Sequence, residues 1–375
     1  MSKKGLAVIY DPHNVYQFLW YYCTYGKDIE WSALCLPNSY KGEYLSEPCK
    51  KLGVFKTIFR DTQQFDSMSL KKRLLIFLKM FFYALVGKQK KFSRNFINKF
   101  IGNYDFDTAV VLTDVGLVSG LFLTLAPEKE IIILEDGMGD YEAREWKNIF
   151  KSFSRFYDVQ GFILSLLGYS NIGHYFPLKT TKNCIKFCSH PDKMLYRKYK
   201  DIKLLFDFTD TYINLFKQLL SKIYIGIEEY FSDKKDLILF TTPLNDLTPN
   251  KEKYNKKVEH YINNYYKGRS ILIKKHPRDI SIYSFDKSIT VTEIDNAIPA
   301  EVLLPFLKDM EIIFYGHSST NLYLVSFGYN PSFFYFNGLD EESKAGNSLC
   351  KYRSKKDFKE RLKFFELEKS KVIEL

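Results

Sequence analysis

Short apolar runs rich in β-branched residues alternate with helical segments along most of this 375-residue chain. Strands are expected at residues 6–9, 31–35, 54–58, 109–112 and 131–134, and again at 237–240, 271–273, 312–315 and 332–335. Helical segments are expected at 15–24, 70–101 and 118–125, and again at 253–266, 299–307 and 321–326. Such alternation predicts parallel sheets covered by helices on both faces. A chain of this length is too long for a single hydrophobic core. We therefore expect an α/β protein of two doubly wound Rossmann-type domains, residues 1–205 and 206–375, facing a central cleft.

Composition narrows the class of partner and the compartment. The net charge of +11 is dispersed, which favours an anionic partner: nucleic acid, anionic lipid or a charged substrate. Recognition signatures of nucleic-acid-binding proteins are missing from the sequence. Six cysteines without framework spacing, and no signal-like start, predict a reducing cytoplasm. Cys184, Cys188 and His190 lack a fourth metal ligand at useful spacing, so buried thiols are expected there.

The longest apolar stretch, residues 74–86, is interrupted by Lys79 and is shorter than the about 20 residues that cross a bilayer. Basic residues flank it on both sides. Two interpretations stay open: an aromatic-rich helix lying on an anionic membrane surface, or a core helix with basic ends.

Two loops follow buried strands and carry opposite charges. Glu135, Asp136 and Gly137 follow the strand at 131–134, and the sequence Lys-Lys-His-Pro-Arg at 274–278 follows the strand at 271–273. Open α/β sheets hold their ligands at the carboxyl ends of strands. A carboxylate base together with an imidazole and cations suits the transfer of a group from a phosphate leaving group to a hydroxyl.

Two more loops are expected at the same edge of the second sheet. One spans residues 241–246, and the other, residues 316–321, brings hydroxyl groups to the start of a helix. Hydroxyls and free N–H groups at a helix N-terminus form a phosphate site, although the same residues also serve as ordinary N-caps. Convergence of three such loops favours the phosphate site.

The ordered set Glu135-Asp136-Gly137, His276-Pro277 and Ser318-Ser319 resembles bacterial sialyltransferases, namely glycosyltransferase family 52 and the polysialyltransferases. The resemblance covers residues 6–335. It implies a GT-B-like fold and a metal-independent enzyme without cofactor. That enzyme would move sialic acid, with inversion, from CMP-sialic acid to a terminal galactose of lipooligosaccharide or capsule.

The resemblance also implies roles for individual residues. His276 would meet the departing phosphate, with Ser318 and Ser319 completing the cradle. The base would be Asp136 or Glu135, or Asp246 if the family-52 pattern holds. The remaining donor-binding residues implied are Gly137, Lys275, Pro277, Glu301 and Thr320.

The expected partners are CMP-sialic acid, a lipid-linked galactose-terminated glycan and an anionic membrane surface, but not nucleic acid; a homodimer is left open. The expected location is the cytoplasm, peripheral to the inner face of the cell membrane. Two rivals remain. A teichoic-acid-type glycerophosphotransferase would use a CDP-alcohol donor, and a nucleic-acid-binding protein would show affinity that falls steeply with salt.

Overall fold

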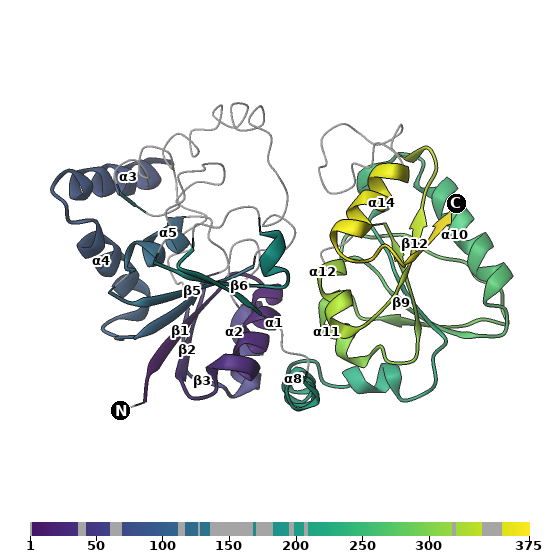
Figure 1. Ribbon diagram of the computed structural model, residues 1–375, viewed down its shortest axis with the longest axis horizontal. Coiled ribbons are helices and arrows are strands. Elements are labelled where there is room, and N and C mark those ends of the chain that lie inside the picture. Colours follow the sequence, from purple (N-terminus) through teal and green to yellow (C-terminus); the bar gives the residue numbers. More distant parts are fainter. Residues whose placement is uncertain are drawn as a thin grey trace. The chain divides into compact units, whose positions relative to one another are not determined.

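The computed structural model describes residues 2–36, 43–60, 70–111, 117–126, 128–135, 168–169, 183–194, 199–205, 209–316, 320–339 and 355–375. The chain divides into two compact units, residues 1–223 and 224–375. Each unit contains one parallel sheet with helices packed on it (Figure 1). The first unit extends to residue 223 because helix α8 (Asp210–Ile223) packs on it, where Phe216 stacks on Trp20 at 4.1 Å between ring centroids.

The first unit is built on a seven-stranded parallel sheet of order β3-β2-β1-β4-β5-β6-β7. Its strands are β1 (Lys4–Ile9), β2 (Glu30–Cys35), β3 (Phe55–Arg60), β4 (Thr108–Val111), β5 (Glu130–Leu134), β6 (Ile185–Cys188) and β7 (Asp201–Leu204). In the part of this unit that the structure describes, the α-helices besides α8 are α1 (Pro12–Tyr21), α2 (Glu43–Leu52), α3 (Leu70–Leu85), α4 (Gln89–Ile101) and α5 (Leu117–Thr124). The expected helical region at 70–101 is two helices, since Gly87 between them has a φ of 65°.

The second unit repeats the design with a six-stranded parallel sheet of order β10-β9-β8-β11-β12-β13. Its strands are β8 (Leu237–Phe240), β9 (Ser270–Lys274), β10 (Thr290–Ile294), β11 (Glu311–Tyr315), β12 (Ser332–Tyr335) and β13 (Lys371–Glu374). The α-helices among its described residues are α9 (Leu244–Leu247), α10 (Lys251–Tyr265), α11 (Ala300–Leu303), α12 (Asn321–Leu324) and α14 (Lys355–Phe364).

Both sheets are Rossmann-type, because the strand order reverses direction once, between β1 and β4 in the first unit and between β8 and β11 in the second. The central strands are buried and apolar, as expected for parallel strands covered on both faces. Loops that leave such a reversal point diverge and open a crevice for a ligand. The two α/β units predicted from the sequence are confirmed.

Candidate functional site

The loops after β8 and β9 are tied together by Thr241. The Thr241 N–H donates to the Lys274 carbonyl at 3.1 Å, and the Thr241 hydroxyl accepts from the His276 N–H at 3.3 Å. The same hydroxyl donates to the carboxylate of Asp279. The backbone of His276 is therefore fixed from the neighbouring strand end, beside the reversal point of the second sheet.

Asp279 organises the turn that carries His276. Its carboxylate is buried and accepts from the Tyr283 hydroxyl at 3.0 Å and from the Ser281 N–H at 2.9 Å, in addition to Thr241. Its own N–H donates to the His276 carbonyl at 2.8 Å. Neither Thr241 nor Asp279 was assigned a role from the sequence. The only signal for them was their place in two loops at one sheet edge.

The imidazole of His276 is partly exposed and has a defined orientation. Its Nδ1 accepts from the Arg278 N–H at 3.2 Å. In a neutral imidazole, an accepting Nδ1 leaves the proton on Nε2. In this tautomer Nε2 carries the N–H, the kind of donor that suits an anionic oxygen. Pro277, also expected to bind the donor substrate, is exposed in the turn between them.

Two lysines precede His276 and differ in environment. Lys274 is buried, and desolvation lowers the pKa of its ammonium group to about 8, although Glu301, Asp295 and Glu293 oppose that shift. Its Nζ donates to the Lys275 carbonyl at 2.6 Å. The Nζ of Lys275 pairs with Glu293 at 2.9 Å. The positive potential of this loop is therefore partly balanced by acids on β10 and α11.

Glu301 and Thr320, both expected on the donor side of the site, are in contact. Glu301 is buried in the first turn of α11, and Thr320, at the start of α12, donates its hydroxyl to Glu301 Oε1 at 3.0 Å. The loop between β11 and α12 begins at Gly316, whose φ of 70° favours glycine. Ser318 and Ser319 lie outside the described residues.

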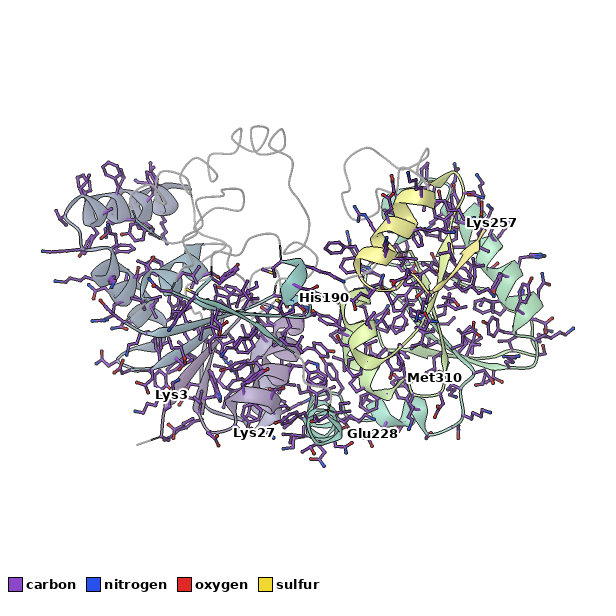
Figure 2. All side chains as sticks on the ribbon, viewed as in Figure 1. Lys3, Lys27, His190, Glu228, Lys257 and Met310 are labelled. Carbon is purple, nitrogen blue, oxygen red and sulfur yellow. The ribbon has the colours of Figure 1, made fainter. Side chains whose placement is uncertain are left out.

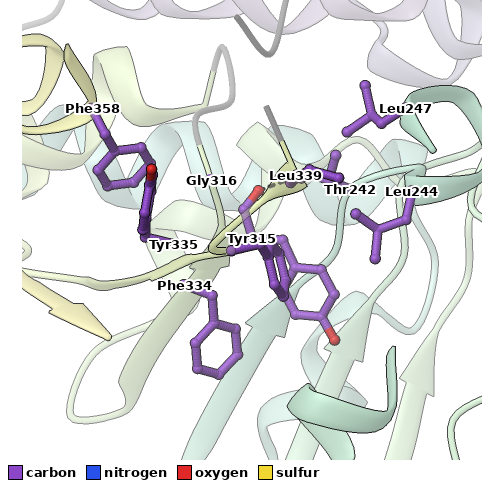
Figure 3. Close-up of a pocket in the computed structure, with 10 residues that line it drawn as sticks. Thr242, Leu244, Leu247, Tyr315, Gly316, Phe334, Tyr335, Leu339 and Phe358 are labelled. Carbon is purple, nitrogen blue, oxygen red and sulfur yellow. Dashed lines mark hydrogen bonds between the residues drawn. The ribbon is translucent and has the colours of Figure 1, made fainter. Parts of the chain in front are cut away.

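A small apolar pocket of about 20 Å³ opens at the carboxyl ends of β8, β11 and β12 (Figure 3). Aromatic side chains, among them Tyr315 and Phe334, form much of its lining. At its rim the Thr242 hydroxyl donates to the Tyr315 carbonyl at 2.7 Å, which joins the loops after β8 and β11. The reversal point of the second sheet is thus bordered by one cationic and one apolar region.

In the first unit, Glu135 directly follows β5 and is fully buried. Its carboxylate accepts from both the N–H and the hydroxyl of Ser189, the N–H at 2.9 Å. Its carbonyl accepts from Gln17 Nε2 at 2.7 Å. Glu135 therefore anchors the end of β5 to β6 and α1. Asp136 and Gly137 lie outside the described residues.

The remaining predicted positions are less informative. Asp246 belongs to α9, but its side chain lies outside the described part of the chain. Cys184, Cys188 and His190 are buried (His190 is labelled in Figure 2), and the described residues contain no group of three potential metal-ligating side chains.

The alpha-2,8-polysialyltransferase family model matches residues 88–325, more than half of the chain. The chain belongs to the alpha-2,8-polysialyltransferase family. This match confirms the predicted resemblance to polysialyltransferases. The assignment to glycosyltransferase family 52 stays a prediction. No curated protein matches this polysialyltransferase-family chain.

Solved structures resemble the fold of this sialyltransferase-family protein. The glycosyltransferase of kitacinnamycin is 8% identical, with 100% of this chain and 87% of that chain covered and a TM-score of 0.53. The UDP-GlcNAc 2-epimerase of Methanocaldococcus jannaschii is 13% identical, with coverage of 99% and 89% and a TM-score of 0.45. The similarity to the glycosyltransferase supports a GT-B-like fold.

Proposed function

We propose that this protein transfers sialic acid from CMP-sialic acid, with inversion at the anomeric carbon, to the terminal sugar of a bacterial capsule or lipooligosaccharide. The observation that carries the proposal is the placement of His276, whose Nδ1 accepts from the Arg278 N–H, in a cationic loop beside the reversal point of a Rossmann-type sheet. The sequence favoured a terminal galactose as acceptor. The family description favours a terminal sialic acid and a 2,8 linkage.

In this reaction the bond between the anomeric carbon and the CMP phosphate oxygen breaks, and a bond to the acceptor oxygen forms. The negative charge that develops on the phosphate is met by His276, by the hydroxyls of Ser318 and Ser319 and by the cationic loop that includes Lys275. A single phosphate needs no divalent ion to neutralise it, so we propose catalysis without metal or cofactor. Chelation with EDTA should leave the rate unchanged.

The acceptor hydroxyl must lose a proton, and we assign Asp136 as the base. Glu135 suits this role poorly, because its carboxylate is buried and accepts two hydrogen bonds from Ser189. We propose that Glu135 instead holds the start of the loop that carries Asp136. Asp246 is the second candidate. Glu301, with Gly137, Pro277 and Thr320, is assigned to the donor nucleotide side.

We further propose that the acceptor is lipid-linked and that the protein works at the inner face of the cell membrane. The resemblance to sialyltransferases of lipooligosaccharide and capsule supports this, since a lipid-linked acceptor would hold its terminal sugar near a bilayer. A second copy of the chain is not required by the chemistry.

The direct test is incubation of purified protein with CMP-sialic acid and one of two acceptors, lactose or an α2,8-linked disialyl-lactose. Release of CMP and a product one sialic acid heavier are expected. Preference for the disialylated acceptor would favour the 2,8 linkage. Product from CDP-glycerol, with none from CMP-sialic acid, would contradict the proposal in favour of a glycerophosphotransferase.

Variants test the assigned roles. His276→Ala should lower kcat about 100-fold or more with donor binding largely kept, since loss of one transition-state donor or acid costs about that much. The matched control is His260→Ala, on the exposed face of α10. Asp136→Asn and Asp246→Asn, made separately, identify the base. Full activity of His276→Ala would remove His276 from the mechanism.

A further inference from the structure

Helix α3 is apolar on two opposite faces. On one face Met80 is fully buried, and Ile76, Phe77, Tyr83 and Ala84 pack partly buried against the core of the first unit. The other face is exposed to solvent. Its large apolar side chains, with their exposed fractions, are Leu74 (40%), Leu75 (54%), Leu78 (43%), Phe82 (63%) and Leu85 (60%), followed by Val86 (63%) just beyond the helix.

The exposed residues form one continuous stripe. Leu74, Leu78, Phe82 and Leu85 are spaced by four, four and three residues, so they line a single side of the helix. Figure 1 shows α3 at the margin of the first unit, and Figure 2 shows side chains projecting from it into open space. A core helix does not leave so wide an apolar stripe in water, because its exposure costs free energy.

The charges of the segment that carries the stripe are all of one sign. Residues 70–101, which include α3 and α4, contain nine Lys or Arg residues and no Asp or Glu. Lys72 and Lys79 are exposed and seven residues apart, which places them on one flank of the stripe. Lys88 and Lys91 follow the helix and are also exposed. An apolar stripe bordered by cations is complementary to a surface of acyl chains and anionic headgroups.

We propose that α3 docks the protein on an anionic membrane surface, with the Leu74–Leu85 stripe inserted at the boundary of headgroups and acyl chains and Lys72 and Lys79 among the phosphates. The inference deepens the proposed function, on which it rests for the lipid-linked acceptor. Insertion would be parallel to the surface. Among the helices of the described residues, none has the length and apolar character that crossing a bilayer requires.

Flotation with vesicles tests the docking. Wild-type protein should float with vesicles of phosphatidylcholine and about one third phosphatidylglycerol, and far less with phosphatidylcholine alone. The triple variant Leu75→Gln/Leu78→Gln/Phe82→Gln should bind at least about tenfold more weakly, because three apolar side chains lose their insertion. The matched control is Ile225→Gln/Val291→Gln, which changes exposed apolar residues of the second unit and should bind like the wild type.

The cationic flank is tested separately. Lys72→Gln/Lys79→Gln/Lys91→Gln should weaken binding to the anionic vesicles about tenfold or more, because each lysine near such a surface contributes favourable energy. A variant with the same charge loss elsewhere serves as its control: Lys234→Gln/Lys256→Gln/Lys371→Gln. Equal loss in both variants would mean that net charge, rather than α3, drives the binding, and would overturn the proposal.

The variant Phe82→Trp gives a positive signal for insertion, so the test does not depend only on variants that lose binding. Phe82→Trp should show a blue-shifted emission with anionic vesicles and quenching by brominated acyl chains, relative to the wild type. The docking proposal fails if the wild-type protein does not bind the vesicles, or if the emission of this tryptophan shows that it remains in water. It also fails if light scattering shows that the wild type is a dimer and that the Leu75/Leu78/Phe82 variant is a monomer.

Transfer to a soluble acceptor distinguishes docking from catalysis. The triple leucine and phenylalanine variant should keep its rate of CMP release with disialyl-lactose, since α3 contributes no residue to the assigned site. Vesicle binding by a wild-type protein that releases no CMP would leave the docking intact and refute the proposed function instead.

Discussion

Replacing Thr241 by valine removes one hydroxyl and keeps the shape of the side chain, so it isolates the link that holds His276. The hydroxyl donates to buried Asp279 and accepts from the His276 N–H. A hydrogen bond to an ionised carboxylate contributes about 1.5–3 kcal/mol, and a neutral one about 1 kcal/mol. We therefore expect the free energy of unfolding of the second unit to fall by about 2–4 kcal/mol.

The effect on turnover should exceed what stability explains. Without its anchor the His276 turn is free to shift, and a displacement of about 1 Å at a reacting group costs about 100-fold in rate. We expect Thr241→Val to lower kcat about 10- to 100-fold, with a smaller change in the KM for CMP-sialic acid. Steady-state CMP release, measured well below the unfolding temperature of the variant, gives both constants.

Thr241→Ser is the matched control, because it keeps the hydroxyl and loses only a methyl group. It should recover most of kcat and of the unfolding free energy. A Thr241→Val variant that loses stability but keeps kcat within twofold of the wild type would refute the positioning role, since Thr241 would then only hold the fold together. An unchanged free energy of unfolding in Thr241→Val would refute the energy assigned to these two hydrogen bonds.

Three further predictions concern Lys274, Glu301 and Ser189. Burial lowers the pKa of Lys274 from 10.5 to about 8, so the unfolded chain binds more protons between these values. The wild type should therefore gain up to about 3 kcal/mol of unfolding free energy relative to Lys274→Met as the pH rises through that window, and a flat difference in urea unfolding would contradict the burial argument. Glu301→Gln should raise the KM for CMP-sialic acid about tenfold with little change in kcat, through loss of charge-assisted hydrogen bonding; an unchanged KM would place Glu301 outside the donor site. Ser189→Ala removes a hydroxyl donor from the buried carboxylate of Glu135 and should cost about 1.5–3 kcal/mol in urea unfolding, whereas an effect below about 0.5 kcal/mol would show that this contact is dispensable.

The sequence predicted the central strands and the edge strand β3, but it did not predict β6, β7, β10 or β13. Strands β1, β4, β5, β8, β9 and β11 are covered on both faces, so their residues form continuous apolar runs that are visible without a structure. Edge strands β7 and β10 are largely exposed and carry charged or polar residues. In β6 the apolar run is interrupted by Lys186. Its side chain is buried, and its Nζ donates a hydrogen bond to the Leu134 carbonyl at 2.9 Å. Backbone pairing defines these strands, and pairing is not visible in a local pattern.

The sequence also located the loop that carries His276, because a basic segment after an apolar run identifies a strand end. It did not reveal what holds that loop. Thr241 and Asp279 are 38 residues apart and meet only because β8 and β9 are neighbours in the sheet. Likewise, nothing local distinguishes Glu135 from Asp136 as a base; the burial of Glu135 depends on Ser189, 54 residues away.

The amino-acid sequence by itself determined that there are two α/β units, that polar loops follow the strands, and that residues 70–101 are amphipathic and basic. Each of these follows from local periodicity, which records how a segment partitions its own side chains between apolar and aqueous surroundings. Tertiary structure decided which carboxylate is buried, which hydroxyl holds the His276 turn, and that the Leu74–Leu85 stripe faces outward while Met80 faces the core. Burial of a given side chain is settled by the distant segments that pack against it, and those contacts exist only in the folded chain.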